Sequence, residues 1–197
     1  MSHIAAALIL AGLWCYSRVR PPRNWSVDNL DWWDGIAAVV ALLCSLLVSG
    51  GAVSVAVLVY VYITSCITDI EVHRYDRWVL RIAILACVCA NVSLVPGEYM
   101  WLWIAMMAVC GIFVGAPKIM GSSDARALML CVAAGVPLYG PEMFVYGLAA
   151  SCLLALAWMA IKAMRERHFS WHDRIPMIPF LVLPHISLAL YYCVLYR

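Results

Sequence analysis

Two aspartates, Asp69 and Asp124, stand where a long apolar segment meets a polar one. Asp69 closes an apolar run, and Asp124 opens another directly after Gly121, Ser122 and Ser123. Two neighbouring carboxyl groups can catalyse hydrolysis, because like charges a few ångströms apart cannot both ionise and the pair shares one proton. The ionised group then takes a proton from water while the neutral group polarises the scissile carbonyl.

A structural role explains the same two residues without any chemistry. Asp69 is then a helix-end residue in the lipid headgroup layer. Asp124 is then part of a helix start, since Gly-Ser-Ser-Asp before an apolar run is a good N-terminal signal. The spacing of the residues leaves both interpretations open. An ionisable group at the margin of hydrocarbon is nevertheless costly, which favours a functional role.

The composition predicts which elements must position these carboxyl groups. Of the 197 residues 66% are hydrophobic and 12% are charged, whereas a soluble domain has roughly 45–50% apolar and about 25% charged residues. In hydrocarbon every backbone polar group must be satisfied within the protein, which favours helices. We therefore predict an all-α fold, a polytopic transmembrane helical bundle. All nine cysteines lie in or beside apolar runs, so neither a disulfide framework nor a metal site is indicated.

Apolar runs divide the chain into candidate spans. The second run is too long for one crossing, so it is either two helices that turn at Gly50 and Gly51 or one long, tilted and kinked helix. The prediction is therefore seven or eight spans. The candidate runs are residues 2–16, 35–68, 78–95, 99–115, 125–136, 143–161 and 175–196.

Basic residues predict how the chain lies in the membrane, because Lys and Arg gather in cytoplasmic loops. The turns at residues 96–98 and 138–142 contain neither residue type, and they alternate with basic loops along the chain. A basic loop after the first run fits the same side and favours eight spans. Asp69 and Asp124 are thus expected at the cytoplasmic face of the cell membrane. The basic residues concerned are Arg18, Arg20, Arg23, Arg74, Arg77, Arg81, Lys118, Arg126, Lys162, Arg165, Arg167 and Arg174.

At residues 67–80, 118–128 and 175–181, the chain resembles the signatures of the type IV prepilin peptidase and archaeal preflagellin peptidase family. Residues 67–80 are similar to the first signature, in which an aspartate closes a helix before a basic stretch. Residues 118–128 look like the GxGD motif, with Ser123 in place of its second glycine and Arg126 in place of the usual lysine. Residues 175–181 are similar to the Pro-Phe-rich opening of that family's last helix. Asp76 and Arg77 stand where the first signature has Pro-Asn.

The resemblance implies a membrane-embedded aspartic endopeptidase that removes the leader peptide of prepilin- or archaellin-like precursors at the cytoplasmic face. Asp69 and Asp124 would be the catalytic pair, and Gly121, Ser123 and Arg126 would contact the substrate. The glycine would let an extended substrate backbone approach closely. The implied partners are the precursor and membrane lipid, with no nucleic acid, metal or other cofactor. Residues 35–197 would form the peptidase-like domain, preceded by a span and loop of unassigned role at residues 1–34.

The alternative is a non-enzymatic membrane protein, either a small transporter or an assembly scaffold. It would use the two aspartates for ion contact or helix capping. Among the histidines, His185 follows Pro184, so we expect it to bond a backbone carbonyl freed by the proline, with proton relay as the alternative. His168 and His172 have helical metal-ligand spacing next to Asp173. They lack a further ligand, so a solvated loop is expected.

Overall fold

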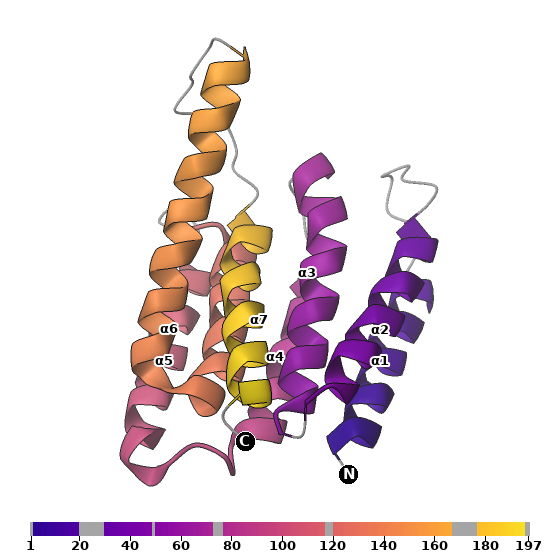
Figure 1. The fold of residues 1–197 in the computed structure, drawn as a ribbon, viewed down its shortest axis with the longest axis vertical. Coiled ribbons are helices and arrows are strands. Elements are labelled where there is room, and N and C mark those ends of the chain that lie inside the picture. Colours follow the sequence, from indigo (N-terminus) through magenta and orange to yellow (C-terminus); the bar gives the residue numbers. More distant parts are fainter. Residues whose placement is uncertain are drawn as a thin grey trace.

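Seven helices make up the computed structural model of the chain, which describes residues 2–19, 30–48, 50–72, 77–116, 120–166 and 177–195 (Figure 1). No strand occurs in these ranges. The predicted all-α fold is therefore confirmed. The helices are α1 (Ser2–Val19), α2 (Leu30–Leu46), α3 (Ala52–Val72), α4 (Arg77–Asn91), α5 (Gly97–Gly115), α6 (Ser122–Glu166) and α7 (Met177–Leu195).

The second apolar run is two helices, not one long kinked helix. α2 ends at Leu46 and α3 begins at Ala52, with a turn between them. Gly51 has φ of +65° there, a left-handed conformation that glycine adopts without steric cost. The missing Cβ also makes room for packing, since a side chain at this position would overlap Leu138. The glycine pair therefore allows the chain to reverse within five residues, 47–51.

α6 contains a second reversal at Gly140. This residue has φ 81° and ψ 166° inside α6, a region of backbone space that is essentially restricted to glycine. Pro141 follows it, and a proline both lacks the N–H of the helical ladder and disfavours helical geometry in the residue before it. The chain therefore leaves one helical segment at residue 139 and starts another at residue 141.

Side-chain contacts show that the two halves of α6 fold back on each other as a hairpin. The Cys131 thiol and the Ser151 hydroxyl reach the same acceptor, the Leu181 carbonyl oxygen, at 3.8 Å and 3.3 Å. In a straight helix, residues 131 and 151 would be about 30 Å apart at 1.5 Å per residue. Both halves therefore pack against α7 at the same level.

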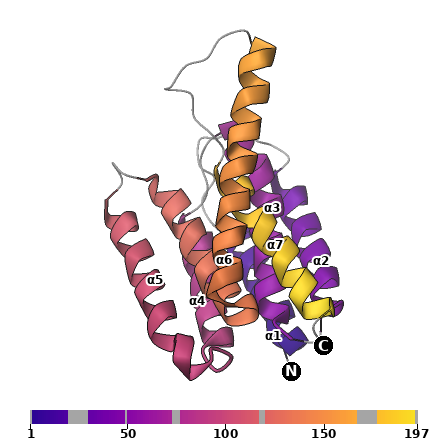
Figure 2. The same ribbon diagram turned by 60° about the vertical axis from the view of Figure 1, so that its left-hand side comes forward.

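The helices run alternately up and down, so the bundle has two distinct ends (Figures 1 and 2). We call the end that carries both termini, the α2–α3 turn and the Gly140 reversal the elbow end. The opposite end, where α3 ends and α6 begins, is the loop end. All the Lys and Arg residues in the described ranges lie toward the loop end, namely Arg18, Arg77, Arg81, Arg126, Lys162 and Arg165.

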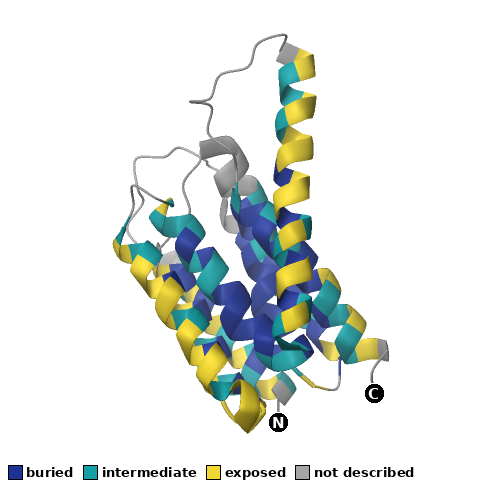
Figure 3. Ribbon diagram, turned by 90° about the vertical axis from the view of Figure 1, so that its left-hand side faces the viewer, coloured by how far each residue is buried: buried dark blue, intermediate teal, exposed yellow. Residues whose placement is uncertain are grey.

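α3 forms the centre of the bundle. Residues 52–61 are buried without exception, and α3 packs against every other described helix except α5. α5 lies at the outside and packs against α6 alone among the described helices. Figure 3 shows the buried residues facing inward and the exposed ones outward. Many exposed residues are large and apolar, including Leu8, Trp101, Ile112 and Met164, which is the surface expected of a protein that faces lipid.

Three helical stretches are long and apolar enough to cross a membrane: Gly97–Gly115, Ser122–Arg165 and Met177–Val194. The second includes the α6 hairpin, whose halves are about 27 Å and 39 Å long at 1.5 Å per residue. The other four described helices have shorter apolar stretches of 14 or 15 residues, namely His3–Tyr16, Trp33–Leu46, Ala52–Cys66 and Trp78–Asn91. Such stretches are about 21–23 Å long at 1.5 Å per residue, whereas the hydrocarbon core is about 30 Å thick. The predicted number of seven or eight spans stays a prediction.

The proposed division after residue 34 also stays a prediction. α2 begins at Leu30, and α1 packs against α2, α3 and α4. The N-terminal helix is therefore part of the same packed bundle as the rest of the chain.

Candidate active site

The two predicted catalytic residues belong to helix segments at the loop end. Asp69 is in the last turn of α3, and its side chain lies outside the described part of the structure. Asp124 is in the first turn of α6 and is half-buried. α3 and α6 pack against each other, and the end of one and the start of the other lie at the same end of the bundle (Figures 1 and 2). The backbone thus brings both sequence positions to one face of the molecule.

The start of α6 explains why a glycine precedes Asp124. The Ala125 N–H donates to the Gly121 carbonyl oxygen at 2.9 Å, which closes the first turn. A Cβ on Gly121 would lie 2.6 Å from Asp124 Oδ2, so the carboxylate folds back over the residue that precedes the helix. A negative charge in the first turn also interacts favourably with the helix dipole, by about 0.3–1 kcal/mol. Gly121 therefore provides space for the Asp124 carboxylate.

The other two predicted site residues flank this carboxylate along the chain. Ser123 is half-buried in the first turn of α6. The Arg126 guanidinium also reaches back toward the helix start, where its Nη1 donates to the Ser122 carbonyl oxygen at 2.9 Å. The first turn of α6 thus holds a carboxylate beside Gly121 and a guanidinium beside the Ser122 carbonyl.

Parts of all three signatures lie outside the described residues. These parts are residues 73–76 of the first signature, 118–119 of the second and 175–176 of the third. Trp78 belongs to the described part of the first signature, and the guanidinium of Arg81, which follows the signature, lies 4.4 Å from the centre of the Trp78 ring. A cation–π pair of this kind suits a membrane–water interface, because tryptophan and basic residues are both common there.

No metal site emerges from the ranges that the structure describes, where no three His, Cys, Asp or Glu residues gather. His168, His172 and Asp173 lie outside those ranges. All nine cysteines are free thiols.

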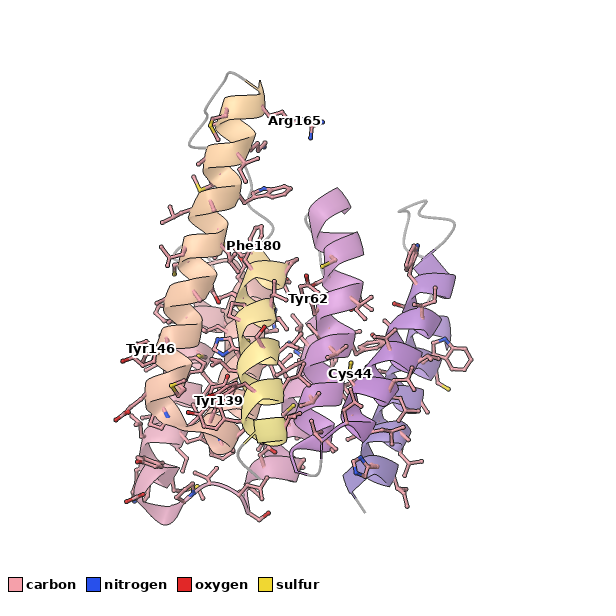
Figure 4. All side chains as sticks on the ribbon, in the orientation of Figure 1. Cys44, Tyr62, Tyr139, Tyr146, Arg165 and Phe180 are labelled. Carbon is pink, nitrogen blue, oxygen red and sulfur yellow. The ribbon has the colours of Figure 1, made fainter. Side chains whose placement is uncertain are left out.

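Sequence reasoning missed a polar cluster in the interior, which we call the His185 cluster: His185, Tyr139, Phe144 and Gly147. His185 is fully buried. Its Nδ1 lies 2.5 Å from the Tyr139 hydroxyl, so the expected bond to a freed backbone carbonyl is wrong. The Phe144 ring stacks on the imidazole with 4.9 Å between ring centres. Figure 4 shows Tyr139 in the lower part of the bundle, beside α7.

Two glycines of α6 make room for this cluster. A Cβ on Gly147 would lie 2.7 Å from His185 Cε1, which is closer than side-chain atoms pack. A side chain on Gly135 would overlap the Tyr139 ring, which folds back along its own helix. The two glycines lie on opposite arms of the α6 hairpin: Gly135 makes room for the Tyr139 ring, and Gly147 makes room for the His185 ring. The sequence alone contained one sign of this arrangement, because a glycine lies on each side of Gly140.

Buried polar groups also join the central helices. The Asn91 amide of α4 donates to Ser54 Oγ of α3 at 2.7 Å and to the Ala133 carbonyl oxygen of α6 at 3.1 Å. The Trp103 indole of α5 donates to the Val132 carbonyl oxygen at 3.1 Å. These bonds hold α3, α4 and α5 against the first arm of the α6 hairpin, which begins with Asp124. The helix that carries this carboxylate is therefore firmly positioned.

In comparisons with known proteins, no family model, no curated protein and no solved structure matches this chain.

Proposed function

We propose that this protein is a membrane-embedded aspartic endopeptidase of the prepilin-peptidase type. In this proposal it cleaves the leader peptide of prepilin- or archaellin-like precursors. The protein is a multi-pass protein of the cell membrane, with eight spans formed by the seven helices and the reversal within α6. The active site faces the cytoplasm, and Asp69 and Asp124 are the catalytic pair.

One observation carries the proposal: two aspartates 55 positions apart in the sequence belong to helix ends on the same face of the bundle. A random pair of loop residues in an up-and-down bundle falls on opposite faces as readily as on the same face. The grouping of the described Lys and Arg residues at the loop end further supports a cytoplasmic location for that face.

In the proposed reaction the two carboxyl groups share one proton. The ionised aspartate takes a proton from a water molecule, which attacks the scissile carbonyl carbon, while the protonated aspartate donates a hydrogen bond to the carbonyl oxygen. Protonation of the leaving amine completes the cleavage. The apolar segment of the precursor would lie in the membrane, and its charged leader would meet the carboxyl pair at the loop end. Ser123 and Arg126 would contact the precursor beside the cut.

A cleavage assay in membranes tests the proposal directly. Wild-type protein should process a pilin-like precursor, and Asp69→Asn and Asp124→Asn should each lower the rate by about 10²-fold or more, because an amide cannot transfer the proton. Glu142→Gln serves as the matched control, since Glu142 is exposed and lies at the elbow end. It should leave cleavage unchanged. If the wild type cleaves the precursor and both Asp→Asn variants cleave it at the same rate, the assignment of the catalytic pair is wrong.

The second candidate is a non-enzymatic assembly scaffold, which the position of Asp124 favours. Its carboxylate folds back toward Gly121 at a helix start, as a purely structural residue would. In that case wild-type protein cleaves no precursor, and Asp124→Ala lowers stability by about 0.5–2 kcal/mol, the usual cost of losing an interaction at a helix start. The two candidates therefore differ in the wild-type assay before any variant is made.

A further inference from the structure

The His185 cluster contains a polar atom that the structure leaves without a partner. His185 Nε2 is buried and has no hydrogen-bond partner within the described part of the chain, although the other ring nitrogen is bonded to Tyr139. A polar atom in the interior is almost always bonded to protein or to an ordered water. An unpaired nitrogen at this position therefore calls for a ligand.

The depth of the nitrogen limits what the ligand can be. His185 is close to the middle of α7 (Met177–Leu195), so it is about 12–15 Å from either helix end at 1.5 Å per residue. The His185 side chain is 0% exposed, so neither a lipid nor a second protein molecule can reach it. The rings of Tyr139 and Phe144 cover two sides, and Gly147 lies against Cε1. A ligand for this nitrogen therefore has to be small, polar and enclosed by the protein.

A second polar group, the Ser151 hydroxyl, contacts the carbonyl oxygen of Leu181, which lies one helical turn before His185 on α7. The Ser151 hydroxyl donates to the Gly147 carbonyl oxygen at 2.9 Å and lies 3.3 Å from the Leu181 carbonyl oxygen. Ser151 is one turn beyond Gly147 on α6, and Leu181 is one turn before His185 on α7. The bond from Nδ1 to Tyr139 directs Nε2 away from the tyrosine. A water needs two to four polar partners, and this arrangement offers Nε2, a hydroxyl and two carbonyl oxygens.

We propose that His185 Nε2 binds a water molecule in the interior of the bundle and that this water bridges the imidazole to Ser151. Tyr139, His185, the water and Ser151 then form one hydrogen-bonded chain across the α6 hairpin and α7. Water can donate to the nitrogen or accept from it, so the site is satisfied in either tautomer of the imidazole. This hydrogen-bonded chain explains why Gly135 and Gly147 make room for the rings of Tyr139 and His185 deep inside the bundle. This inference is independent of the proposed peptidase activity.

Water-edited solid-state NMR of the full chain in lipid bilayers tests the inference. The probe is magnetisation transferred from water to ¹⁵N-labelled histidine rings and valine backbone amides, and the His185 signal is assigned by its loss in His185→Phe. We expect the His185 ring to receive magnetisation at least threefold faster than buried valines of α3, such as Val57. Ser151→Ala should lower that rate at least twofold. Ser187→Ala is the matched control, because this exposed serine lies on the lipid-facing side of α7 and should have no effect.

Two results would overturn the inference. A His185 ring that receives magnetisation no faster than Val57 means that Nε2 is dry. Fast transfer that Ser151→Ala leaves unchanged means that the water does not bridge to Ser151. The wild-type measurement needs no destabilising substitution at the site, so a variant that fails to fold does not prevent the decision.

Discussion

Gly147→Ala tests the packing of the His185 cluster most directly. The added Cβ would lie 2.7 Å from His185 Cε1, 2.9 Å from Nδ1 and 3.0 Å from Leu188 Cδ1, whereas carbon atoms pack at about 3.5–4.0 Å. The imidazole would have to move by nearly an ångström. That shift would break the 2.5 Å contact between Nδ1 and the Tyr139 hydroxyl, because the ring is also confined by Phe144.

The expected cost follows from three contributions. Overpacking a well-packed site destabilises by about 1–3 kcal/mol, and loss of one hydrogen bond inside a membrane protein adds about 0.6 kcal/mol. Replacing glycine by alanine in a helix returns up to about 1 kcal/mol. We therefore expect Gly147→Ala to lower the free energy of unfolding by about 1–3 kcal/mol. Reversible unfolding of the protein in mixed micelles, followed by tryptophan fluorescence, measures this change.

Two companion variants make the result decisive. Gly111→Ala on α5 is the matched control, since a Cβ there would meet no atom within 4 Å and should be neutral or slightly stabilising. In a His185→Ala background only the contact with Leu188 remains, so Gly147→Ala should cost much less and the two changes should be coupled by about 1 kcal/mol or more. Equal effects of Gly147→Ala and Gly111→Ala, or additive effects of the changes at positions 147 and 185, would refute the packing argument.

Three further predictions concern other parts of the chain. Gly51→Ala should lower the free energy of unfolding by about 2 kcal/mol or more, because φ of +65° is unfavourable for alanine and the Cβ would overlap Leu138. Gly50→Ala is its control, because a Cβ there meets nothing within 4 Å, and it should lower the unfolding temperature much less. Asn91→Leu should cost about 1–2 kcal/mol in the same assay, because it removes both interhelical hydrogen bonds of a buried amide. If the proposed peptidase activity is present, Ser123→Gly should preserve or raise cleavage and Ser123→Val should lower it sharply, since a β-branched residue fills the space beside the carboxyl pair; unchanged cleavage in the valine variant would argue against substrate passing this turn.

Local features of the sequence predicted the all-α fold. Long apolar runs require helices because the backbone must be satisfied within each segment. Gly50 and Gly51 indicated either a turn or a kink, and the structure has the turn. The Gly140-Pro141 pair separated two apolar runs that the structure joins as the arms of one hairpin. Basic loops alternate with turns that contain no Lys or Arg, and this alternation predicted that Asp69 and Asp124 lie on the same side. The helix ends that carry them do lie at the same end of the bundle.

The interior contacts could not be obtained in the same way. His185 meets Tyr139, 46 positions away, and not the neighbouring carbonyl that Pro184 suggested. Gly121 makes room for Asp124 itself, a contact that the motif did not reveal. The physical reason is that in a membrane protein both the lipid-facing and the buried sides of a helix are apolar, so the hydrophobic pattern does not indicate which side faces a partner. Close packing of small residues and a few buried hydrogen bonds select the pairing, and both depend on residues that come together only in the folded bundle.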